Sequence, residues 1–184
     1  MRFFWSIVPF ALALGGCVTT NPTVSSNAAA TPPPTAIVVP VGTEKAFDVL
    51  NYYAQTASPN GLGACWAYKN VHQDLVNRAE GLAKTGRHSE AWAGFHGAAE
   101  RVAACAVLDK KPSISISDAF DLAGGYLALS AIVAKQGKTI SGTPAARKSA
   151  QDAITLLSVH REKNEDLIKK VVATGLVPAS QVKK

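Results

Sequence analysis

The sequence predicts an all-α domain of about five helices, preceded by a proline-rich segment that does not fold. Apolar residues between positions 43 and 184 recur with the spacing of amphipathic helices, and no stretch there alternates apolar and polar residues as a strand would. The uncharged residues 18–42, in contrast, contain five of the ten prolines of the chain. The chain therefore divides into residues 1–16, a tether over 17–42 and an α-helical domain over 43–184.

The first sixteen residues have the parts of a secretory signal peptide. Arg2 supplies a positive charge, residues 3–14 form an apolar run, and Gly15 and Gly16 are small residues suited to cleavage. A transmembrane helix needs about 20 apolar residues, so this run is too short to span a bilayer. We interpret residues 1–16 as a signal peptide.

The motif Leu14-Gly15-Gly16-Cys17 ends this segment and resembles the lipobox of bacterial lipoproteins. The resemblance implies that the Cys17 thiol receives a diacylglycerol and that cleavage leaves Cys17 as the new N-terminus. Acyl chains contribute about 0.8 kcal/mol per buried CH₂, so Cys17 would anchor the protein firmly to a membrane. An ordinary secretory signal that happens to be cleaved near a cysteine is the competing interpretation.

The residue after Cys17 bears on which membrane is involved. In the lipoprotein family an aspartate at that place favours retention in the inner membrane, whereas Val18 stands here. The resemblance thus implies an outer-membrane anchor with the domain facing the periplasm, and the inner membrane and the cell surface remain alternatives.

Residues 17–42 are rich in Pro, Ser, Thr and Ala and predict a flexible tether. Prolines favour the extended polyproline II conformation at about 3.1 Å per residue, so the tether can place the domain up to about 75 Å from the anchor. Residues 37–41 are apolar enough to dock on the domain instead.

Three helices are expected in the first half of the domain. Thr43 should cap the first, which ends at residues 58–61 (Ser-Pro-Asn-Gly). The second covers about 64–84 and ends at Thr85-Gly86, and the third covers about 88–108. The residues expected to face inward are Phe47, Leu50 and Ala54 in the first helix, Tyr68, Val71, Leu75, Ala79 and Leu82 in the second, and Ala91, Trp92, Phe95, Ala98, Val102 and Cys105 in the third.

Two further helices complete the domain. Ser117-Asp118 should open the fourth, which ends near Gly137. Its many small residues predict a central position with close backbone packing, a surface helix being the alternative. The last helix should open with Thr143 as cap and Pro144 at the first helical position, and continue to Thr174. The small residues of the fourth helix are Ala119, Ala123, Gly124, Gly125, Ala128, Ser130, Ala131 and Ala134.

The stretch GRHSEAWAGFHGA, residues 86–98, resembles the turn and second helix of a tetratricopeptide repeat. In that family a small residue at Ala91, an aromatic at Phe95 and a small residue at Ala98 let two helices approach closely. The resemblance extends back to residue 75, but Ala103 stands where the repeat usually has a helix-ending proline. It implies an array of such hairpins, and a simple antiparallel bundle is the alternative.

Motifs for catalysis and metal binding are absent from the sequence. There is no HExxH, CxxC or GxSxG, and no glycine-rich phosphate loop follows a strand. His96 and Glu100 lie one helical turn apart and are expected to be a solvated pair. We therefore predict no enzymatic activity, no cofactor and no metal site.

The charge of the domain permits an anionic partner. Omitting Arg2 lowers the formal charge from +6 to +5, which suits lipid headgroups or an acidic protein. The signs are interspersed along the chain, so most of the charge is expected to be solvated surface. A location in the cell envelope disfavours nucleic acid as a partner.

Polar residues interrupt the apolar stripe of the last helix at His160 and Asn164. Either the helix leaves the bundle there or a partner docks on it. On the second interpretation His160, Asn164, Ile168 and Val171 form the binding face. Charged substitutions at Ile168 and Val171 should then weaken partner capture while largely sparing thermal stability.

Taken together, these features predict a lipid-anchored periplasmic lipoprotein that acts as a non-enzymatic helical binding or assembly module. Its expected partners are the membrane, through the lipid on Cys17, and a protein of a secretion, transfer or envelope-maintenance machine. The alternative is a protective lipoprotein of the immunity or inhibitor type that blocks an envelope-attacking enzyme, and a third reading is a cryptic hydrolase. The sequence specifies neither the partner nor the oligomeric state.

If Cys17 carries lipid, Cys65 and Cys105 remain as a pair in an oxidising compartment, where disulfides persist. The midpoint between them is residue 85, within the turn expected between the second and third helices. Two antiparallel helices joined there would bring Cys65 and Cys105 level, within the Cα separation of about 7 Å that a disulfide requires. Two free buried thiols are the alternative.

We accordingly predict that Cys65 and Cys105 are oxidised to a disulfide in the native protein. In the chain-entropy model, closing a loop of this length stabilises the fold by about 4 kcal/mol. Mass spectrometry of protein purified from the envelope without reductant, after alkylation of free thiols, should find neither cysteine modified. Alkylation at both positions would contradict the pairing.

Overall fold

The computed structural model describes residues 37, 39–57, 65, 71–178 and 180, which lie in the compact unit Pro34–Lys184. The predictions for Cys17, for the tether up to residue 36 and for the end of the first helix at residues 58–61 fall outside the described residues. So do residues 64 and 66–70, at the expected start of the second helix.

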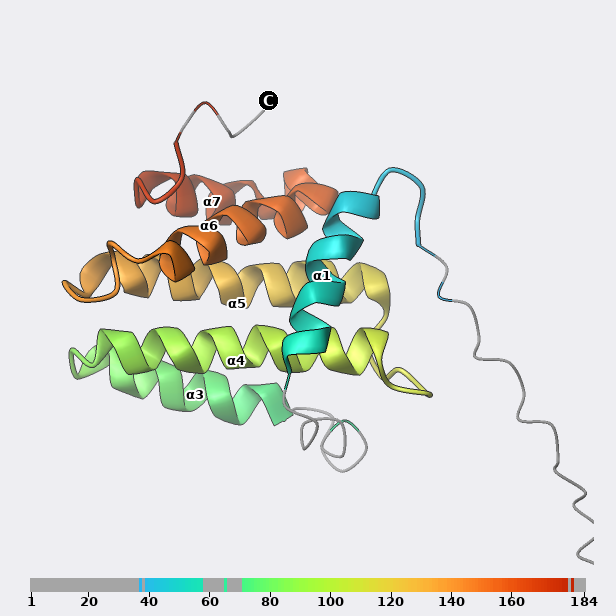
Figure 1. Ribbon diagram of the computed structural model, residues 1–184, viewed down its shortest axis with the longest axis horizontal. Helices are drawn as coiled ribbons and strands as arrows, with labels where there is room; N and C mark the ends of the chain where they lie inside the picture. Colours follow the sequence, from blue (N-terminus) through green and yellow to red (C-terminus); the bar gives the residue numbers. More distant parts are fainter. Residues whose placement is uncertain (1–36, 38, 58–64, 66–70, 179, 181–184) are drawn as a thin grey trace, which may run out of the picture. The chain divides into compact units, whose positions relative to one another are not determined.

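The described residues form helices and no strand, which confirms the predicted all-α class. Helices α3 to α6 lie side by side in chain order, each reversing the direction of its predecessor (Figure 1). Helix α1 crosses this layer in contact with α4, α5 and α6, and α7 packs on α5 and α6. The bounds are α1 (Glu44–Thr56), α3 (Val71–Lys84), α4 (His88–Val107), α5 (Ile116–Gln136), α6 (Pro144–Leu157), the 3₁₀ turn η2 (Ser158–His160) and α7 (Arg161–Ala173).

Helix α5 occupies the centre of the bundle, as its small residues predict. It contacts α1, α4, α6 and α7. A Cβ atom built on Gly124 would lie 3.0 Å from side-chain atoms of Leu156 and Leu157, so a larger residue there would require these leucines to shift. Helix α5 is long and apolar enough to span a bilayer by length and composition, and its buried face forms the core of the bundle.

Two helix starts depart from expectation in detail. Ser115 caps α5 in place of Ser117, and its Oγ accepts a hydrogen bond from the Asp118 N–H at 3.0 Å. Thr43 precedes α1 as predicted, but its Oγ1 donates to the carbonyl of Pro40 at 2.7 Å and does not accept from the helix. The predicted cap at Thr143 is confirmed, because its Oγ1 accepts from the Ala146 N–H at 3.2 Å.

The last helix is interrupted, contrary to expectation. The turn η2 directs the chain back, so that α7 lies alongside α6 (Figure 1). His160 has φ −118° and ψ 57°, which lies outside the helical region and marks the break. Helix α7 then ends at Ala173, and Gly175 follows with φ +70°, the conformation that favours glycine at a helix terminus.

This break changes the environment of the residues beyond it. Ile168 and Val171 are 3% and 0% exposed and belong to the main core. The expectation that they form an accessible partner face is therefore wrong, because the chain reversal turns this side of α7 onto the bundle. A charged substitution at either position would place a charge in the core, where burial without a partner is strongly unfavourable.

Helices α3 and α4 form the hairpin expected on either side of Thr85-Gly86. Gly86 has φ +80°, a conformation that only glycine adopts readily. Residues of the two helices meet in a second, smaller core cluster. The buried members of this cluster are Val76, Ala79, Ala91, Phe95 and Ala98, together with Val133 of α5.

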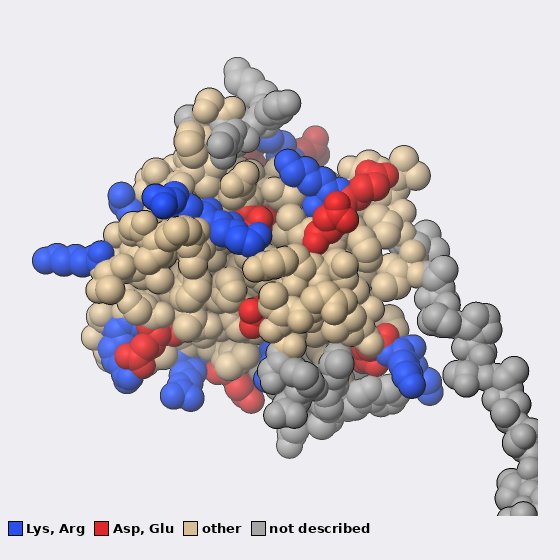
Figure 2. Space-filling model, viewed as in Figure 1, with Lys and Arg blue, Asp and Glu red and all other residues tan. Residues whose placement is uncertain are grey.

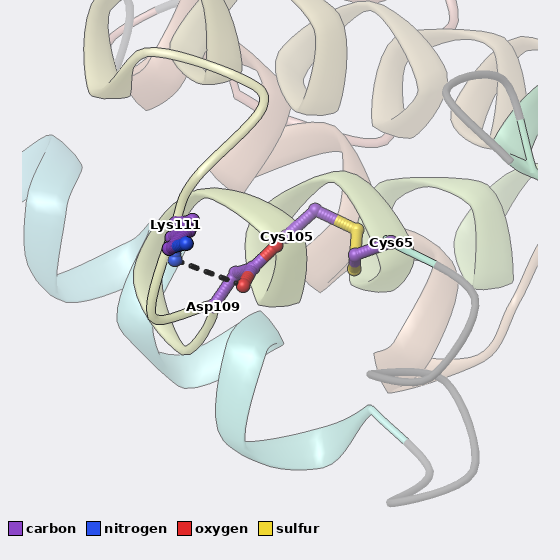
Figure 3. Close-up of a disulfide and its surroundings, with 4 residues drawn as sticks. All are labelled: Cys65, Cys105, Asp109 and Lys111. Atoms are coloured by element: carbon purple, nitrogen blue, oxygen red, sulfur yellow. Dashed lines mark hydrogen bonds between the residues drawn. A yellow bond between two sulfur atoms is a disulfide. The ribbon is translucent and has the colours of Figure 1, made fainter. Parts of the chain in front are cut away.

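Cys65 and Cys105 form the expected disulfide, with their Cα atoms 5.6 Å apart (Figure 3). Their exposed fractions are 6% and 4%, so surrounding side chains shield the bond from solvent. The bond fixes Cys65 against the C-terminal half of α4, the register that the hairpin geometry predicts.

The α3–α4 contact yields a test with an internal control. A Cβ atom on Gly94 would lie 2.8 Å from the Cβ of Ala79, whereas one on Gly97 would meet only the Leu75 Cδ1 atom at 3.9 Å. We expect Gly94→Ala to lower the free energy of unfolding by about 1–3 kcal/mol through overpacking. Gly97→Ala, in the same helix, should raise it by up to about 1 kcal/mol through helix propensity. Urea denaturation measures both, and equal effects would contradict the close approach.

Candidate functional site

Two groups of polar side chains lie between helices of an alanine-rich bundle. We name them the Asp121 cluster, at the contact of α5 with η2 and α7, and the Tyr53 cluster, where α1, α4 and α6 meet. The Asp121 cluster comprises Ser117, Asp121, His160, Lys163 and Asn164. The Tyr53 cluster comprises Tyr53, His96, Glu100, Lys148, Ser149 and Asp152.

Asp121 projects from α5, and its carboxylate contacts three side chains from η2 and the start of α7. Its Oδ1 accepts a hydrogen bond from Asn164 Nδ2 at 2.7 Å and lies 3.0 Å from His160 Nδ1. Its Oδ2 accepts from Lys163 Nζ at 2.8 Å. Asn164 Nδ2 also reaches the Leu157 carbonyl at 3.4 Å, so the cluster braces the turn between α6 and α7.

The electrostatics of Asp121 favour its ionised form. Partial burial by itself would raise the pKa of this carboxyl, but hydrogen bonds from Lys163, His160 and Asn164 outweigh it and lower the pKa below its ordinary value. The same contact raises the pKa of Lys163. The carboxylate therefore stays ionised at neutral pH and holds α7 on α5.

His160 and Asn164 were singled out by the sequence, whereas Asp121, which joins them, was missed. The sequence did carry a signal for Asp121. This carboxylate lies in the helix that small residues predict to be central, and a charge in such a position needs a partner.

An open pocket of about 660 Å³ adjoins the Asp121 cluster. The pocket carries charges of both signs, and no group of three metal-binding side chains occurs among the described residues. Its lining residues are Ser117, Asp118, Asp121, Ser158, Val159, His160, Arg161, Glu162 and Lys163.

The Tyr53 cluster centres on a buried hydrogen bond. Tyr53 is fully buried, and its hydroxyl donates to Asp152 Oδ2 at 2.9 Å. Lys148 Nζ donates to the same oxygen at 2.7 Å and lies 4.2 Å from the centre of the Tyr52 ring. Burial and the neighbouring Asp152 carboxylate raise the pKa of Tyr53, so the phenol stays protonated and ties α1 to α6.

His96 and Glu100 are not the solvated pair that we expected. Their side chains are 24% and 25% exposed, and the His96 ring stacks on Trp92 with a centroid distance of 4.8 Å. Burial lowers the pKa of His96 and raises that of Glu100, so both groups are driven toward their neutral forms. The pair is shielded because α1 packs on α4 and because Ser149 of α6 lies against the His96 ring.

Ser149, His96 and Glu100 contact one another as the serine, histidine and carboxylate of a hydrolytic triad do. Ser149 Oγ lies 3.4 Å from His96 Nδ1, and Glu100 Oε1 lies 3.6 Å from His96 Nε2. Ser149 is 0% exposed, however, so its hydroxyl lies inside the bundle. The three residues therefore serve to join α4 to α6. The absence of enzymatic activity stays a prediction from the sequence.

Comparisons with known proteins found no matching family model, curated protein or solved structure. The resemblances to a lipobox and to a tetratricopeptide hairpin consequently rest on the residues that carry them.

We predict that the Asp121 cluster stabilises the fold in a pH-dependent way. A lowered folded-state pKa means that the carboxylate stabilises the fold above its ordinary pKa of 3.8, and that this contribution is lost as the pH falls through the folded value. Asp121→Asn should cost about 1–2 kcal/mol at pH 7, since it weakens charge-assisted hydrogen bonds at a partly exposed site.

The matched control is Glu162→Gln, which removes an exposed carboxylate lining the same pocket. Thermal melts at pH 7 and below pH 3.8 give the comparison. The deficit of Asp121→Asn should shrink in acid while Glu162→Gln stays close to wild type at both values. A deficit unchanged by pH would show that the ionised form of Asp121 is not what stabilises the turn.

Proposed function

We propose that this protein is a lipid-anchored lipoprotein of the bacterial cell envelope, whose helical domain acts as a non-enzymatic binding or assembly module. The observation that carries the proposal is the LGGC motif ending at Cys17, followed by an uncharged proline-rich stretch before the domain. This order of anchor, tether and folded unit is what a protein needs to work at a distance from the membrane that holds it.

Features of the domain support the proposal. A disulfide joins Cys65 to Cys105, as suits an oxidising compartment, and leaves Cys17 as the remaining cysteine of the chain. The side chains of the two polar clusters bond to one another between helices, so we assign them to stabilising the fold. A binding role then falls to exposed side chains.

Tyr52 is the exposed side chain best suited to a protein contact. It is 48% exposed on α1, and Lys148 lies over its ring. Tyrosine is enriched at protein interfaces because it combines a large apolar ring with a polar end. It replaces Ile168 and Val171 as the surface position at which partner capture is best tested.

The anchor is tested with Cys17→Ser, which removes the thiol that would be acylated. This variant should lose lipid incorporation and remain unprocessed by the lipoprotein route. Val18→Asp is the matched control, because it keeps the cysteine and should remain acylated while shifting to the inner membrane. Metabolic labelling with a fatty acid and membrane fractionation report both outcomes. Normal processing and labelling of Cys17→Ser would contradict the anchor.

The binding role is tested by crosslinking in intact cells and purification from solubilised membranes. A specific envelope protein should be recovered with the wild type and lost, by about tenfold or more, with Tyr52→Ala. Leu122→Ala on α5, another partly exposed large side chain, is the control and should retain capture. Equal recovery with both variants would place the contact elsewhere.

A further inference from the structure

The positive charge of the domain is concentrated at one end of the bundle. Residues 84–90 and 135–147 contain five Lys or Arg residues and one carboxylate, whereas the other described residues contain ten Lys or Arg and twelve carboxylates. One end is thus strongly positive while the remainder is slightly negative. We name the cationic side chains of these two segments the basic end; they are Lys84, Arg87, Lys135, Lys138 and Arg147.

These two segments are neighbours in space. A Cβ atom on Gly137 would lie 2.9 Å from the Cβ of His88, so the loop between α5 and α6 touches the start of α4. Figure 1 places the α3–α4 turn and the α5–α6 loop at the same end of the bundle, on the left, and Figure 2 shows blue side chains projecting there. The two signs are interspersed along the chain, but folding brings five cations and only one carboxylate together at this end of the bundle.

The basic end is exposed and mostly uncompensated. All five of its cationic residues are exposed, and Arg87 pairs with Glu90. The other four make no ion pair among the described residues. The closest further carboxylate along α3 is Glu80, one turn before Lys84. Several like charges are therefore held together without neutralising partners.

The side chains of this surface bear on whether its anionic partner is an acidic protein or a layer of lipid headgroups. The large exposed apolar side chains of the described residues, at positions 37, 41, 52, 108 and 122, all lie outside the two segments. A protein interface depends on apolar or aromatic anchors, and its core is depleted in lysine. Attraction to lipid headgroups needs only a cluster of Lys and Arg within a Debye length of the surface.

We propose that the basic end is an electrostatic contact surface for anionic phospholipid headgroups. Each Lys or Arg held near such a leaflet strengthens attachment roughly fivefold. The inference rests on the proposed function in one respect: a domain already tethered by lipid needs only a weak attraction to settle on the bilayer in a defined orientation. The contact would alternate with extension on the tether, and its occupancy would depend on salt and on lipid charge.

The test uses the unit Pro34–Lys184, which contains the core and the disulfide and lacks Cys17. It is mixed with vesicles of phosphatidylcholine alone, or with equal parts of phosphatidylglycerol, and bound protein is measured by flotation. Binding should require the anionic lipid and should disappear at 1 M salt, where the Debye length is about 3 Å. Because no lipid anchor is present, failure here would leave the anchor of the proposed function untouched.

Paired charge reversals locate the surface. Lys135→Glu with Lys138→Glu removes two cations of the basic end and should weaken vesicle binding by about 25-fold or more. Lys45→Glu with Lys110→Glu makes the same change in net charge at exposed positions near the opposite end and should cost no more than about fivefold. Thermal melts of both variants confirm that each remains folded.

Three outcomes would overturn the proposal. The first is equal binding to neutral and anionic vesicles, and the second is an equal loss for the two charge reversals. The third is failure to bind anionic vesicles combined with retention on immobilised poly-glutamate, which would assign the basic end to an acidic protein.

Discussion

The close approach of helix backbones across small residues is the constraint on which this bundle depends. Alanine buries little apolar area, so helices lined with it gain stability only when they pack at short range, where dispersion contacts are numerous. Gly94 against Ala79 brings α4 onto α3, and Gly124 against Leu156 and Leu157 brings α6 onto α5. Helices α1 and α7 then pack on the surfaces of this four-helix layer.

Polar clusters supply the connections that small apolar side chains cannot. Asp121 joins α5 to α7, and Asp152 joins α6 to the hydroxyl of Tyr53 on α1. Networks of this kind favour one arrangement of the helices over others, because a shifted helix would leave buried groups unpaired. His96, which the sequence singled out, and Ser149 thereby have a structural role at the contact between helices.

The same packing distributes charge unevenly over the surface. Hairpin turns bring the ends of α3 and α5 beside the starts of α4 and α6, and the cations near these ends meet at one pole of the bundle. Together with the proposed anchor at Cys17, the proposed lipid contact would give the protein two attachments to a membrane, one covalent and one electrostatic. The two differ in physical character, since a lipid anchor is insensitive to salt whereas surface charge is screened by it.

Local signals in the sequence determined the helical class, the α3–α4 turn at Gly86, the cap at Thr143 and the pairing of Cys65 with Cys105. Each depends on periodicity, on a residue's backbone preference or on a hairpin spanning adjacent helices. The tertiary structure decided the break at His160, the burial of Ile168 and Val171, the role of Asp121 and the gathering of cations at one end. Asp121 meets His160 and Asn164 across 39 and 43 residues of chain, and a contact at that separation depends on how α6 and α7 fold back, which no local pattern encodes.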